Sequence, residues 1–175
     1  MSRRFAPEAA SVSDTAQRRA ALRRIASLEV PSDEGFAALA RLAALACETP
    51  MALAALIELE RVWYMAVHGM NAGDIPAHHG FHNEVAGSGQ VLEVHDTRRD
   101  VRFSASEWVT GPLGIRYCAA APIVFEEATI GTLCVLDRKP RELSAKSLQA
   151  LVEMATLAGV MLRARIEAFA MLSGH

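Results

Sequence analysis

The sequence is poor in the features that define several specialised classes of protein. It has three cysteines, Cys47, Cys118 and Cys134, and none of them belongs to a CxxC pair. Neither a disulfide framework nor a zinc site is therefore predicted. No apolar run approaches the roughly 20 residues that span a bilayer, and no apolar signal segment follows the arginines near the N-terminus. We expect a cytoplasmic protein without a membrane partner.

The chain also lacks an excess of charge of one sign. Its 18 lysines and arginines and 20 aspartates and glutamates give a net charge of −2. Because no positive field covers the molecule, a nucleic-acid partner is not expected. Hydrophobic residues make up 51% and charged residues 22% of the 175 residues. These values are typical of one folded domain rather than of a disordered chain.

Hydrophobic periodicity predicts helices towards both ends of the chain. Residues 1–13 are rich in Ser, Ala and Arg, and we expect a flexible segment there, followed by a single domain over residues 14–172. Apolar stripes predict helices over about residues 14–28, 33–48 and 145–172, with Ser32 and Ser144 as N-caps.

The middle of the chain has the character of strands. Two hairpins are expected, around Glu60-Arg61 and Glu126-Glu127, together with one short strand. The expected strands cover residues 51–59, 62–68, 91–94, 116–124 and 129–137. Short helical turns are expected near Asn83 and over residues 104–109, with Ser104 as a cap. This order of elements predicts an α+β fold with a central antiparallel sheet of five to six strands flanked by helices.

Two expected elements carry apolar residues on more than one side. The run Met51–Ile57 is continuously apolar, so that strand should be covered on both faces of the sheet. The last helix is apolar over most of its circumference, and either the first helix or a second copy of the chain must cover what the sheet does not. We favour a homodimer formed through the terminal helices.

Two segments resemble the GAF domain family closely. Gly111–Ile123 reads GPLGIRYCAAAPI and is similar to the family segment GIRFYAGAPL. Ile130–Ser144 reads IGTLCVLDRKPRELS and is similar to IGTLCVIDRRPRELS. Residues 20–36 and 94–103 resemble two further family segments, so the resemblance covers roughly residues 18–165.

The resemblance implies a GAF/PAS-like fold in which N- and C-terminal helices pack together on one face. It also implies a non-enzymatic sensory module that binds a small molecule or a partner protein in signal transduction. Such domains stand before diguanylate cyclases and histidine kinases, so the chain is read as a free-standing domain or a piece of a longer protein. One alternative is a ligand-free dimerisation or docking domain. Another is a redox enzyme similar to the free methionine sulfoxide reductases, although their loop cysteines are missing here.

The resemblance also places a pocket between the central loop and the facing strands. The predicted roof is Phe81, His82 and Glu84. Phe103 and Trp108 would form an aromatic wall, and Tyr117 or Ala119 the floor. The full set is Phe81, His82, Glu84, Phe103, Trp108, Tyr117 and Ala119. His82 and Glu84 stand where the family has a cysteine and a histidine, so a ligand held by that pair is not carried over.

The loop histidines give a weak metal signal. His78, His79 and His82 form an HHxxH sequence without regular helix spacing, and neither cysteine nor paired carboxylates accompany it. We interpret them as solvated loop residues, with metal or haem binding, pH sensing and ligand contact as the alternatives. No cofactor is implied.

The relative placement of two cysteines depends on the register of the second hairpin. With a two-residue turn at Glu126-Glu127, residue 118 pairs with residue 135, which places Cys118 and Cys134 on opposite faces. A slip of one residue would bring them together and open the alternative of a redox switch. Cys47 is predicted to be a core residue.

Overall fold

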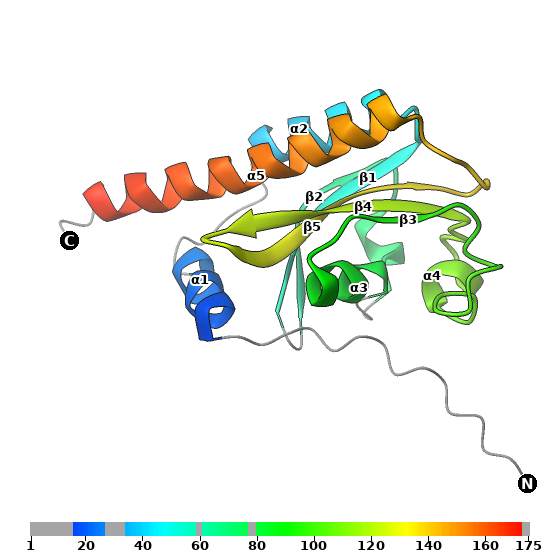
Figure 1. The fold of residues 1–175 in the computed structure, drawn as a ribbon, viewed down its shortest axis with the longest axis horizontal. Coiled ribbons are helices and arrows are strands. Elements are labelled where there is room, and N and C mark those ends of the chain that lie inside the picture. Colours follow the sequence, from blue (N-terminus) through cyan, green and yellow to red (C-terminus); the bar gives the residue numbers. More distant parts are fainter. Residues whose placement is uncertain (1–15, 27–33, 59–60, 77–79, 173–175) are drawn as a thin grey trace, which may run out of the picture.

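A five-stranded antiparallel sheet with the order β2-β1-β5-β4-β3 forms the centre of the protein (Figure 1). The computed structural model describes residues 16–26, 34–58, 61–76 and 80–172. The predictions for residues 1–13, Ser32, Glu60, His78 and His79 lie outside these ranges. The strands are β1 (Met51–Ile57), β2 (Val62–His68), β3 (Leu92–Val94), β4 (Tyr117–Phe125) and β5 (Ala128–Asp137). The predicted antiparallel sheet flanked by helices is confirmed.

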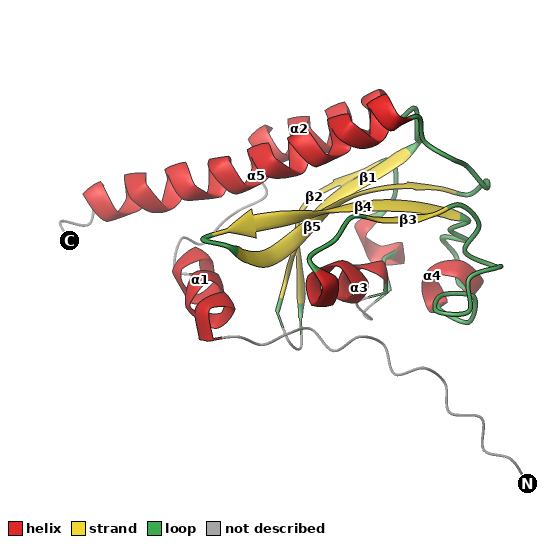
Figure 2. Ribbon diagram, in the orientation of Figure 1, coloured by secondary structure: helices red, strands yellow, loops and turns green. Residues whose placement is uncertain are grey.

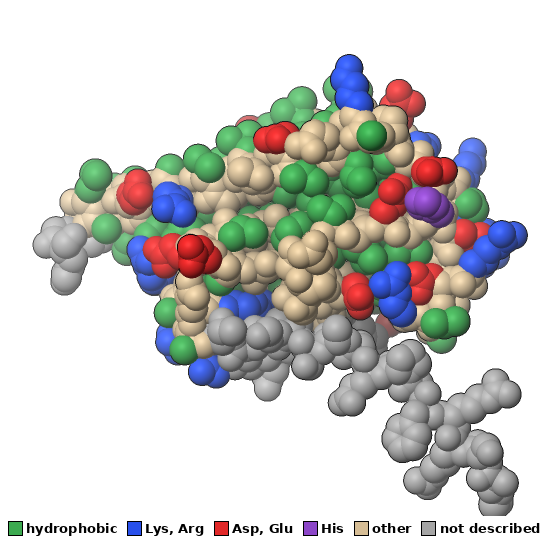
Figure 3. Space-filling model, viewed as in Figure 1, with side chains coloured by type: hydrophobic (Ala, Val, Ile, Leu, Met, Phe, Trp, Pro, Cys, Tyr) green, Lys and Arg blue, Asp and Glu red, His purple; other side chains and the backbone are tan. Residues whose placement is uncertain are grey.

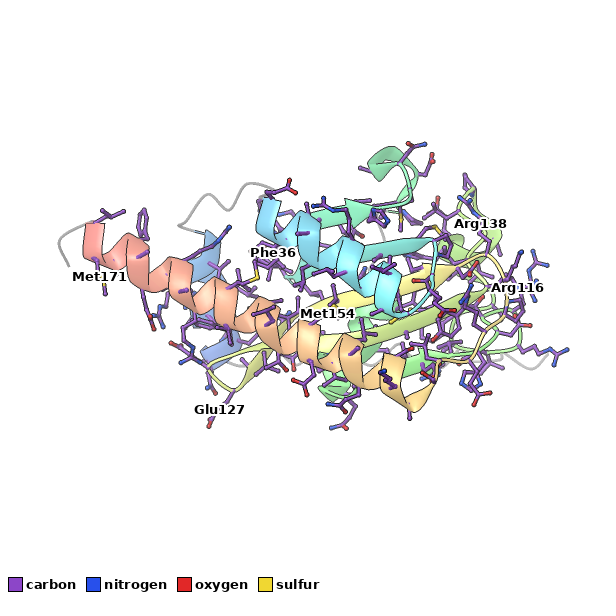
Figure 4. All side chains as sticks on the ribbon, turned by 90° about the horizontal axis from the view of Figure 1, so that it is seen from above. Phe36, Arg116, Glu127, Arg138, Met154 and Met171 are labelled. Atoms are coloured by element: carbon purple, nitrogen blue, oxygen red, sulfur yellow. The ribbon has the colours of Figure 1, made fainter. Side chains whose placement is uncertain are left out.

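Two helices lie side by side across one face of this sheet (Figures 1 and 4). They are α2 (Glu34–Ala46) and α5 (Ala145–Leu172), and Ser144 caps α5 as predicted by accepting a hydrogen bond from the Ser147 amide at 3.0 Å. The helix α1 (Ala16–Ala26) contributes to the same core near the β4–β5 hairpin. The long C-terminal helix therefore packs beside α2 rather than along the first helix.

α5 approaches the sheet closely at Gly159. A Cβ atom at this position would lie 2.4 Å from the Val124 carbonyl oxygen of β4, so no larger residue fits without movement. Cys47 is buried on this face and its thiol donates to the Ser147 carbonyl at 3.6 Å, which confirms it as a core residue. None of the described helices, α5 included, combines the length and the apolarity needed to cross a membrane.

Helices also cover the other face of the sheet (Figure 2). α3 (Phe81–Ser88) and α4 (Glu107–Thr110) enclose a second core there, and the 3₁₀ turn η1 (Ala72–Asp74) lies in the preceding loop. All seven residues of β1 are buried, which confirms that this strand is covered on both sides. The cap of α4 is Ser106, which accepts from the Trp108 amide, and not Ser104 as expected.

A bulge shifts the register of the β4–β5 hairpin by one residue. Glu126 and Glu127 form the turn with φ values of 48° and 66°, as a two-residue hairpin requires. The pairing then shifts between Ile123 and Val124, because Ile130 is an extra residue on β5. Cys118 consequently faces Leu136, and the predicted pairing of residue 118 with residue 135 is wrong. Both Cys118 and Cys134 belong to the core beneath α3.

The start of α3 packs tightly against α4. Gly80 precedes α3 with φ +52°, and a Cβ atom there would lie 2.5 Å from the indole nitrogen of Trp108. Trp108 is completely buried, so the ring has no free space into which it can move. This contact fixes where α3 begins relative to the wall of the second core.

We predict that Gly80→Ala destabilises the domain more than Gly114→Ala does. Both glycines have a positive φ, but no atom lies within 4 Å of a Cβ at Gly114. Backbone strain should cost about 1–3 kcal/mol at either site, and the collision with Trp108 should add about 1–3 kcal/mol at Gly80 alone. Urea unfolding of both variants measures the difference; equal losses would show that Trp108 does not restrain α3.

Candidate functional site

α3 carries a histidine into the second core. The His82 side chain is 1% exposed. Its Nδ1 atom lies 2.7 Å from the hydroxyl of Thr132 and 3.7 Å from the sulfur of Cys134, both on β5. These two contacts join α3 to the central part of the sheet, so His82 is held in a fixed orientation.

A tyrosine of β2 faces the same histidine. The rings of Tyr64 and His82 meet edge to face with centroids 6.0 Å apart. Burial, and then the charge of a Cys134 thiolate, raise the pKa of the Tyr64 phenol well above its ordinary value, so this group stays neutral. The adjacent Trp63 is 49% exposed on the outer side of the strand. Tyr64 is therefore the aromatic residue of β2 that borders the site.

Three buried polar atoms of this site lack hydrogen-bond partners among the described residues. They are the Tyr64 hydroxyl, His82 Nε2 and Asn83 Oδ1. An unsatisfied buried polar atom typically costs about 1–3 kcal/mol, and native proteins contain few of them. The rings of Tyr64 and His82 face each other, so this part of the core has hydrogen-bonding capacity that the described protein atoms do not use.

Aromatic rings pack together beside His82. Phe81 packs against Phe103 with ring centroids 4.7 Å apart and against Trp108 at 5.9 Å. His82 and Trp108 meet edge to face at 5.6 Å. The structure thus brings together four of the predicted residues, Phe81, His82, Phe103 and Trp108.

Glu84 lies at the rim rather than in the roof. Its carboxylate accepts a hydrogen bond from Arg102 at 3.2 Å, and Arg102 also bonds to Asp100 at 2.6 Å while lying over the ring of Phe103. The hydrogen bond from Arg102 lowers the pKa of Asp100 despite partial burial. Glu84 therefore ties α3 to the loop that follows β3.

Tyr117 and Ala119 lie on the opposite face of the sheet and do not form the floor. Both belong to the core beneath α2 and α5, and the Tyr117 hydroxyl donates to Glu93 at 2.7 Å. Burial, followed by this hydrogen bond, raises the pKa of the Tyr117 phenol well above its usual range. Successive residues of a strand point to opposite faces, so Cys118 and Ala120 face the site instead.

The sequence analysis missed the residues that make the site polar. Tyr64, Asn83 and Thr132 were not singled out as lining, and Cys134 was weighed only as one of a thiol pair. Thr132 did carry a signal, because it is a polar residue inside an otherwise apolar strand. The orientation of Tyr64 depends on a register shift between β1 and β2, at which Met65 has no partner on β1. No local sequence pattern indicates this shift.

The described residues contain no group of three or more side chains arranged to hold a metal ion. His95 is separate from the site: its ring is about half exposed and its Nε2 atom lies 3.5 Å from Glu93. His82, in contrast, lies inside the core, so its interpretation as a solvated loop residue is wrong.

Comparison with known proteins gives a consistent result. Residues 10–162 match the GAF domain family. The sequence is 34% identical over 130 residues to the Cyclic di-GMP phosphodiesterase PA2567 of Pseudomonas aeruginosa, an alignment that covers 73% of this chain but 22% of that protein. The chain thus spans about a fifth of the length of this relative.

Solved structures of low sequence identity share the fold. A domain of a putative two-component sensor histidine kinase from Sinorhizobium meliloti superposes with a TM-score of 0.65 at 16% identity, covering 79% of this chain and 94% of that one. The GAF domain of an Acinetobacter phosphoenolpyruvate-protein phosphotransferase gives 0.61 at 18% identity, covering 92% and 98%. Since the family match covers most of the chain and the architecture agrees with it, the protein belongs to the GAF domain family.

Proposed function

We propose that this GAF domain is a non-enzymatic sensory module that binds a small molecule between α3 and the sheet. The observation that carries the proposal is the pair of unsatisfied buried atoms on the facing rings of Tyr64 and His82, beside the ring of Trp108. Binding sites commonly combine an apolar lining with a few oriented polar groups. A ligand that bonds to these atoms would remove the cost of leaving them unpaired.

The lining favours a neutral, partly apolar ligand. Arg102 is the described cation at the rim, and Glu84 and Asp100 already neutralise it. Phe81 and Trp108 are buried and would supply aromatic contacts to a ligand once α3 moves, while the Tyr64 hydroxyl can both donate and accept. A planar molecule with polar groups along one edge fits this chemistry better than a phosphate does.

Ligand binding at this site would affect α5 through the strands of the sheet. His82 contacts Thr132 and Cys134 of β5, and the opposite faces of β4 and β5 pack against α5. A ligand that reorients His82 therefore biases the strands on which α5 rests. The relative from Pseudomonas is named a cyclic di-GMP phosphodiesterase. We infer that the present domain has a regulatory rather than a catalytic part in a signalling protein.

We predict opposite effects of removing two tyrosine hydroxyls. Tyr64→Phe deletes an unsatisfied buried hydroxyl, so the free energy of unfolding of the ligand-free domain should rise by about 1 kcal/mol. The same change should weaken ligand binding by roughly tenfold, because it removes a hydrogen-bonding group from the site. Tyr117→Phe is the matched control: it loses the hydrogen bond to Glu93, so stability falls while binding is unchanged.

Native mass spectrometry of the purified domain, before and after denaturation, identifies a retained ligand by its mass. If none is retained, a panel of cellular metabolites that includes cyclic di-GMP is titrated against the wild-type domain and both variants. Binding that Tyr64→Phe leaves unchanged, or absence of any binding, would contradict the proposed site. The second result would favour a domain used only for dimerisation or docking.

The exposed side of α5 supports the proposal of a homodimer. Leu157 and Val160 are about half exposed although both are apolar. Ala164, Ala168 and Met171 continue this stripe at spacings of three and four residues, which is the pattern of a helix that packs against another helix. Hydrophobic side chains remain visible along α5 in the space-filling view (Figure 3), and Met171 lies at its far end (Figure 4).

We predict that Val160→Glu converts a dimer of the domain into a monomer, because a carboxylate would be buried between two apolar stripes. Val101→Glu is the control, since Val101 is 81% exposed in the loop that follows β3. Sedimentation velocity should show a dimer for the wild type and for Val101→Glu. A monomeric wild type, or a dimeric Val160→Glu variant, would contradict the assignment of this surface.

A further inference from the structure

We propose that Cys134 and Cys118 form a reversible disulfide beneath α3 when the domain meets a hydroperoxide, with His82 accepting the proton of Cys134. This activity is separate from ligand binding and does not depend on it. It rests on three groups that the hairpin bulge and α3 bring to one place.

The reacting atoms are close together. The sulfur of Cys134 lies 3.7 Å from His82 Nδ1 and 3.4 Å from the Thr132 hydroxyl. Cys118 lies in the same buried core, diagonally across from Cys134 on the neighbouring strand. A thiol beside an imidazole, with a second thiol nearby, is the arrangement of an attacking and a resolving cysteine. His82 Nε2 is buried and has no hydrogen-bond partner among the described residues.

Cys134 is the more acidic of the two thiols, as an attacking cysteine must be, and Cys118 is the less acidic. Burial opposes ionisation of Cys134, but its interactions with Cys118, with the charge and ring nitrogen of His82 and with the Thr132 hydroxyl hold its pKa well below the ordinary value. Burial, and then the neighbouring Cys134, raise the pKa of Cys118. Cys134 therefore provides the thiolate, and Cys118 remains a protonated thiol.

Cys47 provides an internal comparison. It lies in the core beneath α2 and α5, on the other face of the sheet. Burial, and then the carboxylate of Glu93, raise its pKa to about 11, and its thiol donates to the Ser147 carbonyl. Without an imidazole partner, Cys47 should not react under conditions that oxidise the other two cysteines.

The chemistry balances with one hydroperoxide. The Cys134 proton passes to His82, and the thiolate attacks the peroxide, so that an S–O bond forms and the O–O bond breaks. His82 returns its proton to the departing oxygen, which leaves as water when the oxidant is hydrogen peroxide. Cys118 then attacks the Cys134 sulfenic acid, the S–S bond forms, and the hydroxyl leaves with the Cys118 proton as a second water. The two thiols lose two electrons and the peroxide gains them.

The strand geometry makes this disulfide reversible rather than a permanent structural cross-link. Cys118 pairs with Leu136 and Cys134 with Ala120, so the two cysteines are diagonal neighbours on adjacent strands. Diagonal neighbours are typically about 7–8 Å apart between Cα atoms, which is longer than a relaxed disulfide spans. Closing the bridge must shift β4 against β5, and a strained bridge is readily reduced.

The oxidant reaches the thiols through local opening of α3. This helix has eight residues and is tied at its rim by the ion pair of Glu84 with Arg102. Short helices held by few contacts open more often than the central strands do. Oxidation would then remove the Cys134 sulfur from His82 and move the strands that support α5.

Peptide mapping of the folded domain tests the proposal. The domain is treated with hydrogen peroxide and digested without reductant. Trypsin releases residues 117–138 as one segment, and cleavage after Glu126 or Glu127 by a glutamyl endopeptidase separates the two cysteines unless a disulfide links them. We expect the linked pair, its loss on reduction, and a free Cys47. Three free thiols, or a bridge that involves Cys47, would overturn the proposal.

Variants assign the roles of the individual groups. Cys118→Ala should stop the reaction at a sulfenic acid on Cys134, which dimedone traps, whereas Cys134→Ala should leave Cys118 reduced. His82→Gln should slow oxidation by roughly tenfold or more, and Thr132→Val, a nearly isosteric change, should slow it less. Cys47→Ala is the control and should not change the rate. Circular dichroism confirms that each variant is folded; an unchanged rate in folded His82→Gln would remove His82 from the mechanism.

Discussion

The one-residue bulge in the β4–β5 hairpin is the constraint on which the rest of the site depends. An isolated two-residue turn would place Cys118 and Cys134 on opposite faces of the sheet. The extra residue, Ile130, shifts the pairing by one residue on the side of the bulge away from the turn. Each residue of β4 there shares a sheet face with a different set of β5 residues than an unbulged hairpin would give it. As a result, the residues near the middle of both strands that point towards α3 are small, sulfur-containing or hydroxylated, while Tyr117 and its neighbours support α5.

The two faces of the sheet consequently have different roles. The face beneath α2 and α5 is filled by apolar residues and a close helix–strand approach at Gly159. The face beneath α3 combines aromatic rings with buried polar atoms that are not fully satisfied. Buried polar groups cost stability unless they are paired, and such costs are concentrated where a protein binds or reacts. This difference between the two faces is the physical reason for placing both ligand binding and thiol oxidation beneath α3.

Much of the architecture could be predicted because it follows from local patterns. The continuous apolar run of β1 implied a sheet covered on both faces, and Ser144 marked the start of α5. The family motifs gave the correct fold, and four of the residues named as a possible lining, Phe81, His82, Phe103 and Trp108, lie close together. These features depend on neighbours in the sequence or on segments that the family shares.

The remaining features depend on register, which local patterns do not determine. A bulge moves every residue beyond it to the other face, so Tyr117 and Ala119 were assigned to the wrong side of the sheet. The same limitation hid Tyr64, whose orientation follows the register shift beside Met65. The burial of His82 was not expected, because the sequence was interpreted as indicating a solvated loop residue. Its contacts with Thr132 and Cys134 could not be expected either, because these residues lie about fifty positions further along the chain.

The central claim is that the bulge brings both cysteines of the hairpin beneath α3. Nuclear Overhauser spectra of the reduced domain test this directly, because they detect protons that lie within about 5 Å of each other in space. The account predicts cross-peaks from the Cys134 β-protons to the His82 ring and from Cys118 to Cys134. Cross-peaks from either cysteine to side chains of α5, such as Ala155, would contradict it.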